Sequence, residues 1–367
     1  MNIVLVSSAG QCGIHECAQI MLHGFRERGH SARFIGIQRQ SNADLRQQMR
    51  RLDGQDEVVI FEYEPGIFWP YGLIREMFRV RFLLGKKLIL SIHEFSPDKF
   101  AEYRVSQALW STKARFGGMR ELVRALGLTS LVAIRYIRLR IALLLLAWLP
   151  NALIVHSEKT ATNLEVGLPR SKFDKVLTAP LAVEPALGDR NEAREALGLP
   201  LDPFVFIIPG FIFRRKRIIE VIDQLPSGPE LWIVGVVPDW EKEYVIEVQA
   251  HLKQSPKANQ VRIIQEYGIE PYIQASDVVV LYYQEIFQSA VASQAAGAGK
   301  PCIFSDLAGF APFESAGIIV RSPLELRQAM IEIQNPSCYR SLAEATRSLR
   351  EELSPARITD QYLEALK

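Results

Sequence analysis

Short, uniformly apolar runs recur along the chain, and longer segments of helical character separate them. The first series comprises Ile3–Val6, Val58–Phe61, Leu88–Ile92 and Leu153–Val155. The second series comprises Phe204–Ile208, Leu231–Val234, Val261–Ile264, Val278–Tyr282 and Cys302–Phe304. Apolar strands that alternate with helices are typical of a parallel sheet covered on both faces. The chain is therefore predicted to contain two α/β units in series.

The length of 367 residues also favours two domains, because a single hydrophobic core rarely extends beyond about 250–300 residues. Between the two series, prolines and glycines surround a short charged helical sequence, NEAREALG, as is typical of a connection. We predict an N-terminal Rossmann-like domain over 1–182, a linker over 183–203, a C-terminal Rossmann-like domain over 204–352 and a last helical segment over 353–367.

The composition is that of an ordinary globular protein, with a net charge of +2 that gives no indication of nucleic-acid binding. The four cysteines form no CxxC pair, which favours reduced thiols and a cytoplasmic location. The first apolar run is too short for a signal peptide and no basic region precedes it. We expect no transmembrane helix, since the uncharged stretch 141–155 is shorter than the ~20 residues of a span and Pro150 interrupts it.

Candidate ligand-binding residues follow three strands of the first series. Gly10 and Gly13 bracket a turn that opens a helix, and the free backbone N–H groups at the start of that helix suit an anion. A tight turn that binds no ligand fits the sequence equally well. His93 and Glu94 end the third strand, where they can bind sugar hydroxyls or stabilise charge; a hydrogen-bonded core histidine is the alternative. Glu64 precedes a turn that Pro-Gly enforces.

Metal binding is not expected. Cys12, His15 and Cys17 could be imagined as ligands, but their spacing matches no standard zinc signature and no second ligand pair follows.

The second series carries a run of cations, Arg214–Arg217, shortly after Gly210. Four cations at the start of a helix oppose the helix dipole, which indicates an anionic ligand such as a diphosphate. A solvated basic face is the alternative for at least two of them, and Lys216 is the strongest candidate ligand.

The segment EIFQSAVASQAAGAGKP, from Glu285 to Pro301, contains a helix of unusually small residues. Such a slim helix allows its N-terminus to approach a ligand closely. Tight packing against the sheet would also explain the small side chains.

Seven segments, in this order, carry a family resemblance: CGIHECA, FEYEPGIF, SIHEF, IVHSEKTATNL, GFIFRRK, ASDVVVLYY and GAGKPCIFSDLAG. Over nearly the whole chain the pattern resembles family-4-type glycosyltransferases with the GT-B fold. The resemblance implies two Rossmann-like domains facing across a cleft, with 353–367 crossing back to the N-terminal domain. It also implies retaining transfer from a nucleotide-diphosphate sugar to a glycan or lipid-linked acceptor, with no cofactor and no metal ion.

The resemblance implies roles for individual residues. The residues implied to be catalytic are His93 and Glu285. The implied donor-binding residues are Gly13, Gly210, Arg215, Lys216, Tyr267, Gly268, Gln288, Ser289, Ala290 and Gln294. The residues implied to lie on the acceptor side are His15, Glu64 and Glu94.

The chain also departs from the family pattern. Phe211 stands where an arginine usually follows the glycine, and the second glutamate of the donor helix is replaced by Ser293 or Gln294, depending on the register. Backbone amides of the turn Gln288–Ala290 would then hold the diphosphate. An alternative is a catalytically inactive GT-B protein that binds a glycan or a partner glycosyltransferase. A nicotinamide-dependent oxidoreductase would need GxGxxG after a strand, which the chain lacks.

The segment 104–140 carries eight Lys and Arg residues against one acid, Glu121, and continues into the apolar sequence IALLLLAWLP. Such a sequence predicts a helical region that associates with an anionic membrane surface, and we expect this surface to be the inner face of the membrane. The alternative is that Leu143–Trp148 packs in the core while the arginines are solvated.

Overall fold

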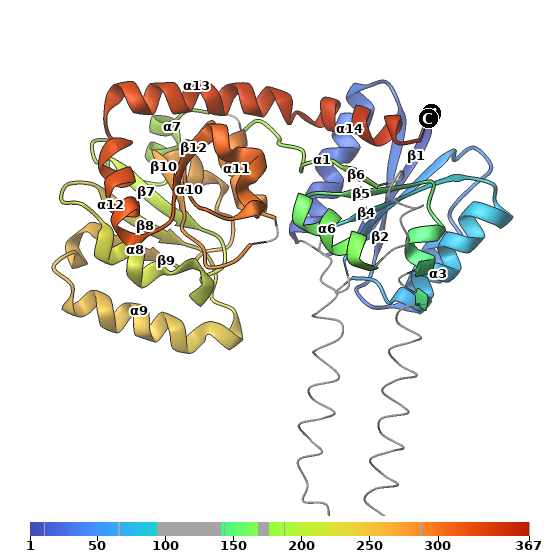
Figure 1. Ribbon diagram of the computed structural model, residues 1–367, viewed down its shortest axis with the longest axis horizontal. Coiled ribbons are helices and arrows are strands. Elements are labelled where there is room, and N and C mark those ends of the chain that lie inside the picture. The colour runs from blue at the N-terminus through green and yellow to red at the C-terminus, as the bar shows by residue number, and fades with distance from the viewer. Residues whose placement is uncertain are drawn as a thin grey trace, which may run out of the picture. The chain divides into compact units, whose positions relative to one another are not determined.

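The computed structural model describes residues 1–10, 12–64, 67–93, 141–142, 144–167, 176–186, 188–286 and 288–366 (Figure 1). Glu94 and the basic segment 104–140 lie outside this described part. Within it, no helix is long and apolar enough to cross a membrane. The chain divides into two compact units, the first formed by 1–179 with 359–367 and the second by 180–358.

Unit 1 is built on a six-stranded sheet in which every described pairing is parallel. The strands are β1 (Asn2–Ser8), β2 (Ser31–Ile37), β3 (Val58–Tyr63), β4 (Lys87–Ile92), β5 (Ala152–Val155) and β6 (Val176–Thr178). Their order is β2-β1-β3-β4-β5-β6, so the direction of winding reverses between β1 and β3. The four strands expected here are confirmed. The sequence pattern missed β2, where Ser31 and Arg33 interrupt the apolar run, and the three-residue β6.

Helices cover this sheet (Figure 1). They are α1 (Gly13–Glu27), α2 (Asn42–Met49), α3 (Pro70–Phe78) and α6 (Glu158–Gly167), and a π-helical turn, η1 (Arg79–Leu83), extends α3. One apolar core joins side chains of β1, β3, β4 and β5 to the inner faces of α2 and α3.

Unit 2 contains a second six-stranded parallel sheet. Its strands are β7 (Val205–Pro209), β8 (Glu230–Val234), β9 (Val261–Ile264), β10 (Val278–Leu281), β11 (Cys302–Ser305) and β12 (Gly317–Val320). The order β12-β11-β10-β7-β8-β9 is that of a Rossmann sheet, with its switch point between β7 and β10. The five strands expected in this half are confirmed, and β12 is an addition. Ligands of such sheets bind beyond the carboxyl ends of the strands at the switch point.

The helices of unit 2 are α7 (Arg190–Ala196), α8 (Ile218–Gln224), α9 (Lys242–Gln254), α10 (Glu270–Ala275), α11 (Ala290–Gly297), α12 (Pro323–Glu332), α13 (Pro336–Glu352) and the first turn of α14 (Pro355–Glu364). The 3-10 turns η3 (Arg214–Lys216) and η6 (Ala308–Ala316) follow β7 and β11. The boundary between the two units falls inside α14, after Ile358.

Residues 183–203, expected as a linker, belong to unit 2. This segment includes α7, whose Arg194 side chain is fully buried and donates to the carbonyl oxygen of Ala275 at 2.7 Å and to Asp277 at 3.0 Å. A buried guanidinium must be paired, so these bonds attach the segment to the second sheet. The short charged helix expected here is present as α7, but it is anchored to unit 2 and is not part of a separate linker.

Candidate functional site

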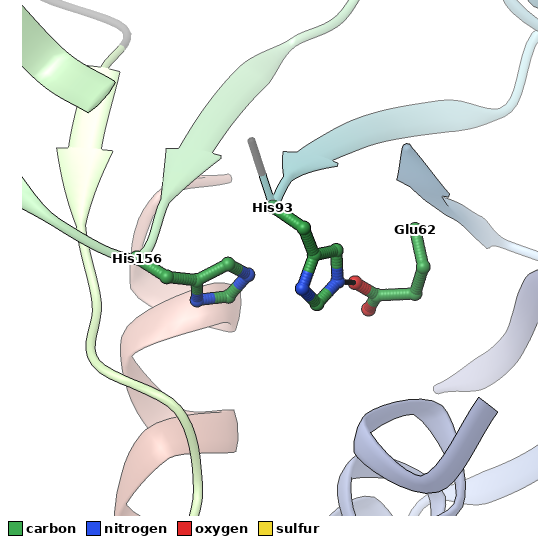
Figure 2. A group of neighbouring side chains, drawn as sticks. All are labelled: Glu62, His93 and His156. Carbon is green, nitrogen blue, oxygen red and sulfur yellow. Dashed lines mark hydrogen bonds and ion pairs between the residues drawn. The ribbon is translucent and has the colours of Figure 1, made fainter. Parts of the chain in front are cut away.

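Three buried polar side chains meet at the carboxyl ends of neighbouring strands in unit 1 (Figure 2). Glu62 lies in β3, and His93 and His156 directly follow β4 and β5. Nε2 of His93 donates to Oε2 of Glu62 at 2.7 Å, and the two imidazole rings lie 4.6 Å apart. His93 is therefore held by a carboxylate at a sheet edge, where parallel α/β folds bind their ligands.

The cluster has a definite charge arrangement. Burial works to raise the pKa of Glu62, but the hydrogen bond and charge of His93 outweigh burial and lower it, so the carboxylate is ionised at neutral pH. Burial, and next the charge of His93, lower the pKa of His156 to about 3. His156 is therefore neutral at pH 7.

Hydrogen bonds fix the tautomer of His156. Its Nδ1 must donate to the carbonyl oxygen of Ala179 at 2.8 Å, because a carbonyl can only accept. Its Nε2 then accepts from the hydroxyl of Ser91 at 2.9 Å, and Ser91 in turn accepts from the hydroxyl of Tyr362 at 3.1 Å. The C-terminal segment, which was expected to cross back to the N-terminal domain, thus supports His156 beside His93.

The cluster could also supply metal ligands. One possible ligand atom from each of Glu62, His93 and His156 lies within 4.8 Å of the other two. To hold an ion, the three side chains would exchange their bonds to each other and to Ser91 for coordination. The expectation that no metal takes part stays a prediction.

The other N-terminal candidates lie at the start of α1 and after β3. Gly13 is the first residue of α1, and a side chain there would meet no atom within 4 Å. Nδ1 of His15 donates to the carbonyl oxygen of Ser8 at 2.8 Å, which leaves Nε2 of its ring for a ligand. Glu64 is half-buried, whereas Glu94 lies outside the described residues.

In unit 2, candidate residues gather at the switch point. Gly210 directly follows β7 with a positive φ of 86°, and a Cβ there would lie 3.3 Å from Nζ of Lys216 and 3.4 Å from Val291 in the first turn of α11. The backbone N–H of Gln284, beyond β10, donates to the carbonyl oxygen of Arg215 at 2.7 Å. The carboxyl ends of β7 and β10, η3 and the N-terminus of α11 therefore converge here.

Two of the four cations in this run are neutralised. Arg214 pairs with Glu247 and Arg217 pairs with Glu220. Arg215 is exposed, and among the described residues no carboxylate contacts it; its guanidinium lies 4.7 Å from the ring centroid of Phe213. Arg215 and Lys216 are therefore the two cations of this run that have no carboxylate partner among the described residues.

Lys216 is almost fully buried, and its Nζ donates to the carbonyl oxygen of Pro209. Burial, and next the charge of Arg215, lower the pKa of Lys216 to about 7. An ammonium group held in this way gains strongly from an incoming anion, because the anion replaces the missing countercharge.

The N-terminus of α11 lies beside this pair of cations. Ser289 caps α11, and its buried Oγ accepts from the backbone N–H of Ala292 at 3.1 Å. Gln288 and Ala290 are half-buried on either side, and Glu285 is exposed at the loop after β10. The small residues further along α11 pack tightly, since a Cβ on Gly297 would lie 2.3 Å from the carbonyl oxygen of Glu184. Packing, the alternative noted from the sequence, accounts for that part of the helix.

A hydrogen bond of Gln294 identifies Glu270, a residue that the sequence pattern missed. Its Nε2 donates to Oε1 of Glu270 at 3.0 Å, which brings a carboxylate from α10 to α11. Gly268 has a positive φ of 95°, and Tyr267 beside it is exposed. No sequence spacing links Glu270 to Gln294, because helix and strand segments separate them.

Scans against protein-family models and curated proteins found no match. Among solved structures, HepE from Anabaena in complex with UDP-glucose is similar over 100% of this chain and 99% of its own, with a TM-score of 0.69 and 14% identity. The chain has the GT-B fold.

Two further structures agree. A glycosyltransferase from Rickettsia africae aligns over 100% of this chain and 98% of its own, with a TM-score of 0.69 and 13% identity. Sucrose-phosphate synthase from Thermosynechococcus elongatus aligns over 99% and 98%, with a TM-score of 0.64 and 13% identity. The predicted fold class, two Rossmann-like domains of GT-B type, is confirmed.

Proposed function

We propose that this GT-B protein is a cytoplasmic, retaining glycosyltransferase that moves a hexose from a nucleotide-diphosphate donor to a glycan or lipid-linked acceptor. The observation that carries the proposal is the pair Arg215 and Lys216 at the switch point of unit 2. The neighbouring cations have carboxylate partners, whereas this pair has none in the part of the chain that the structure describes. A diphosphate supplies the missing charge, and the N-terminus of α11 adds backbone donors.

The nucleoside half of the donor has its own candidate contacts. Glu270 and Gln294 form a carboxylate and amide pair on neighbouring helices, a combination that recognises the two hydroxyls of a ribose. Tyr267 and Gly268, in the loop after β9, would face the base. HepE has been crystallised with UDP and with UDP-glucose, so UDP is the first nucleotide to test.

In the proposed reaction, the bond between the anomeric carbon and the diphosphate oxygen breaks. The acceptor hydroxyl attacks from the face that the diphosphate leaves, and its proton passes to the departing phosphate oxygen. In unit 2, Lys216, Arg215 and the turn Gln288–Ala290 would stabilise the charge on the leaving group, and Glu285 would contact the transferred sugar from the loop after β10. In unit 1, His93 would bind a sugar hydroxyl in the orientation set by Glu62.

Calorimetric titration of the full chain with UDP and UDP-glucose tests this function, with Lys216→Ala as the variant. Arg214→Ala is the matched control, since Arg214 is a neighbouring cation already paired with Glu247. We expect Lys216→Ala to weaken binding at least about tenfold, because a charged hydrogen bond contributes roughly 1.5–3 kcal/mol. Equal affinity in the two variants would remove the proposed role of Lys216.

The second candidate is a GT-B protein that binds a glycan or a partner glycosyltransferase without catalysis. It is favoured by Phe211, which is 48% exposed beside Gly210 where the family places a cation. Thermal-shift measurements with UDP, GDP, ADP and dTDP separate the two candidates. Stabilisation by one of the four favours the transferase, and none at high concentration favours the binding protein.

A further inference from the structure

Unit 1 carries an exposed face of large apolar side chains that the proposed transfer reaction does not use. It extends along the outer side of α3 and η1 and onto the neighbouring helical residues 144–148 (Figure 1). Its exposed members are Tyr71, Phe78, Phe82, Leu83, Leu144, Leu145 and Trp148. We refer to these seven residues as the aromatic face.

Three rings join the two helical parts of the aromatic face. The ring of Phe82 lies 5.0 Å from that of Phe78 and stacks on that of Trp148 at 5.9 Å, so the two helical segments share one surface. A contiguous exposed apolar surface of this kind is unusual on a protein and marks an interaction site.

Sequence spacing explains why these side chains point outward. Leu73, Met77 and Val80 occupy the inner side of α3 and η1 and are buried in the core of unit 1. Tyr71 and Phe78 recur on the opposite side at helical spacing. The π-helical turn, closed by the bond from the N–H of Leu84 to the carbonyl oxygen of Arg79 at 2.9 Å, continues that outer side to Phe82 and Leu83.

The charges around the aromatic face are basic. Arg75, Arg79 and Arg81 lie on the same two elements, and Lys87 begins β4 four positions later. Glu76 is the acid of this stretch, and it is buried and paired with both Arg75 and Arg79. The guanidinium of Arg81 lies 5.9 Å from the ring centroid of Phe82, so a cation adjoins the exposed rings.

We infer that the aromatic face docks onto an anionic lipid bilayer. Aromatic rings flanked by arginine and lysine are suited to the boundary between headgroups and acyl chains, where rings insert and cations meet lipid phosphates. A protein partner would need acidic groups matched to these arginines, whereas an anionic bilayer supplies them at every position. The inference is independent of the nucleotide site in unit 2.

Flotation of the full chain with vesicles tests the inference. The vesicles contain phosphatidylcholine alone or phosphatidylcholine mixed with phosphatidylglycerol. Leu83→Asp is the test variant, because Leu83 is 71% exposed and its replacement removes little packing. Ile246→Asp is the matched control, since Ile246 is 65% exposed on α9 of unit 2.

We expect the wild type and Ile246→Asp to float with phosphatidylglycerol vesicles, with less binding at high salt. Leu83→Asp should bind about tenfold more weakly, as expected when an inserted leucine becomes a carboxylate. UDP binding and the melting temperature of Leu83→Asp should match the wild type, which separates this inference from the proposed transferase function. Equal flotation of both variants would overturn the inference. The inference would also be overturned if the wild type did not float. The same holds if the wild type formed a concentration-dependent dimer that Leu83→Asp abolishes.

Discussion

Nε2 of His93 lies 2.7 Å from Oε2 of Glu62, and both side chains are buried at the carboxyl ends of adjacent strands in unit 1. The carboxylate fixes which ring nitrogen carries the donated proton and which way the imidazole faces. His93 is therefore oriented by Glu62, which lies in the segment FEYEPGIF but was not among the residues predicted for the site.

Replacing Glu62 by Gln should lower transferase activity by about 10–100-fold, the usual loss when the partner that orients a functional histidine is removed. The turnover number should fall more than the affinity for the nucleotide, since the proposed nucleotide contacts lie in unit 2. Steady-state kinetics with UDP-glucose would measure both. A variant with unchanged turnover would show that Glu62 has no positioning role.

The same substitution has a pH signature in stability. The pKa of Glu62 is lower in the folded protein than its ordinary value of 4.5, so its ionised form stabilises the fold above about pH 4.5. That stabilisation is lost as pH falls through the folded-state pKa. Urea midpoints should therefore show Glu62→Gln less stable than the wild type at pH 7, with the difference shrinking toward pH 4. A difference that is independent of pH would contradict this account.

Nucleotide affinity should depend on pH through Lys216. The pKa of Lys216 is lowered to about 7, so the free protein loses the proton as pH rises from 6 to 8, whereas a bound diphosphate requires the ammonium form. Affinity should fall with rising pH, by up to about tenfold per unit above pH 7. Calorimetry in buffers of different ionisation enthalpy should detect proton uptake on binding. Lys216→Arg should bind without this dependence, and an equal slope in both proteins would assign it to another group.

Discrimination between ribose and deoxyribose should depend on Glu270. Glu270→Gln should weaken UDP binding by about tenfold while leaving dUDP binding unchanged, because a lost hydrogen bond to a charged group is worth roughly 1.5–3 kcal/mol. Glu266→Gln is a matched control, since Glu266 already accepts from the hydroxyl of Tyr272 at 2.7 Å. Parallel losses for UDP and dUDP in Glu270→Gln would place this carboxylate elsewhere.

The C-terminal segment should stabilise unit 1 through one hydroxyl. Tyr362→Phe removes the donor to Ser91 beneath His156 and should cost about 1 kcal/mol in the free energy of unfolding. Tyr63→Phe is the control, because the buried hydroxyl of Tyr63 has no hydrogen-bond partner among the described residues. Chemical denaturation should show a lower free energy of unfolding for Tyr362→Phe and an unchanged one for Tyr63→Phe. Equal effects of the two substitutions would show that the contact with Ser91 does not stabilise the fold.

Several features of the candidate site follow from sequence because they are local. Gly210 and the cations of η3 are a few residues apart, so a strand, a tight turn and a basic run can be recognised in order. The N-terminus of α11 is similarly marked by Ser289 and the small residues after it. Glu64, Glu285 and the turn Gln288–Ala290 remain predictions for ligand contact.

Other features depended on the folded chain. The linker expected over 183–203 became part of unit 2 because Arg194 finds Ala275 and Asp277 there. The resemblance singled out Arg215 and Lys216 from the run of four cations, and the structure shows that Glu247 and Glu220 pair with the other two. Composition shows that charges exist, but only neighbours in space show which ones are neutralised.

By itself the sequence determined two parallel α/β units, because a buried strand is encoded by a short apolar run whose pattern needs no distant partner. The tertiary structure decided the pairings that give the site its chemistry: Glu62 with His93, Glu270 with Gln294 and Tyr362 with Ser91. Each pair joins elements distant along the chain, and a hydrogen bond depends on distances of a few ångströms that only the packed sheets set.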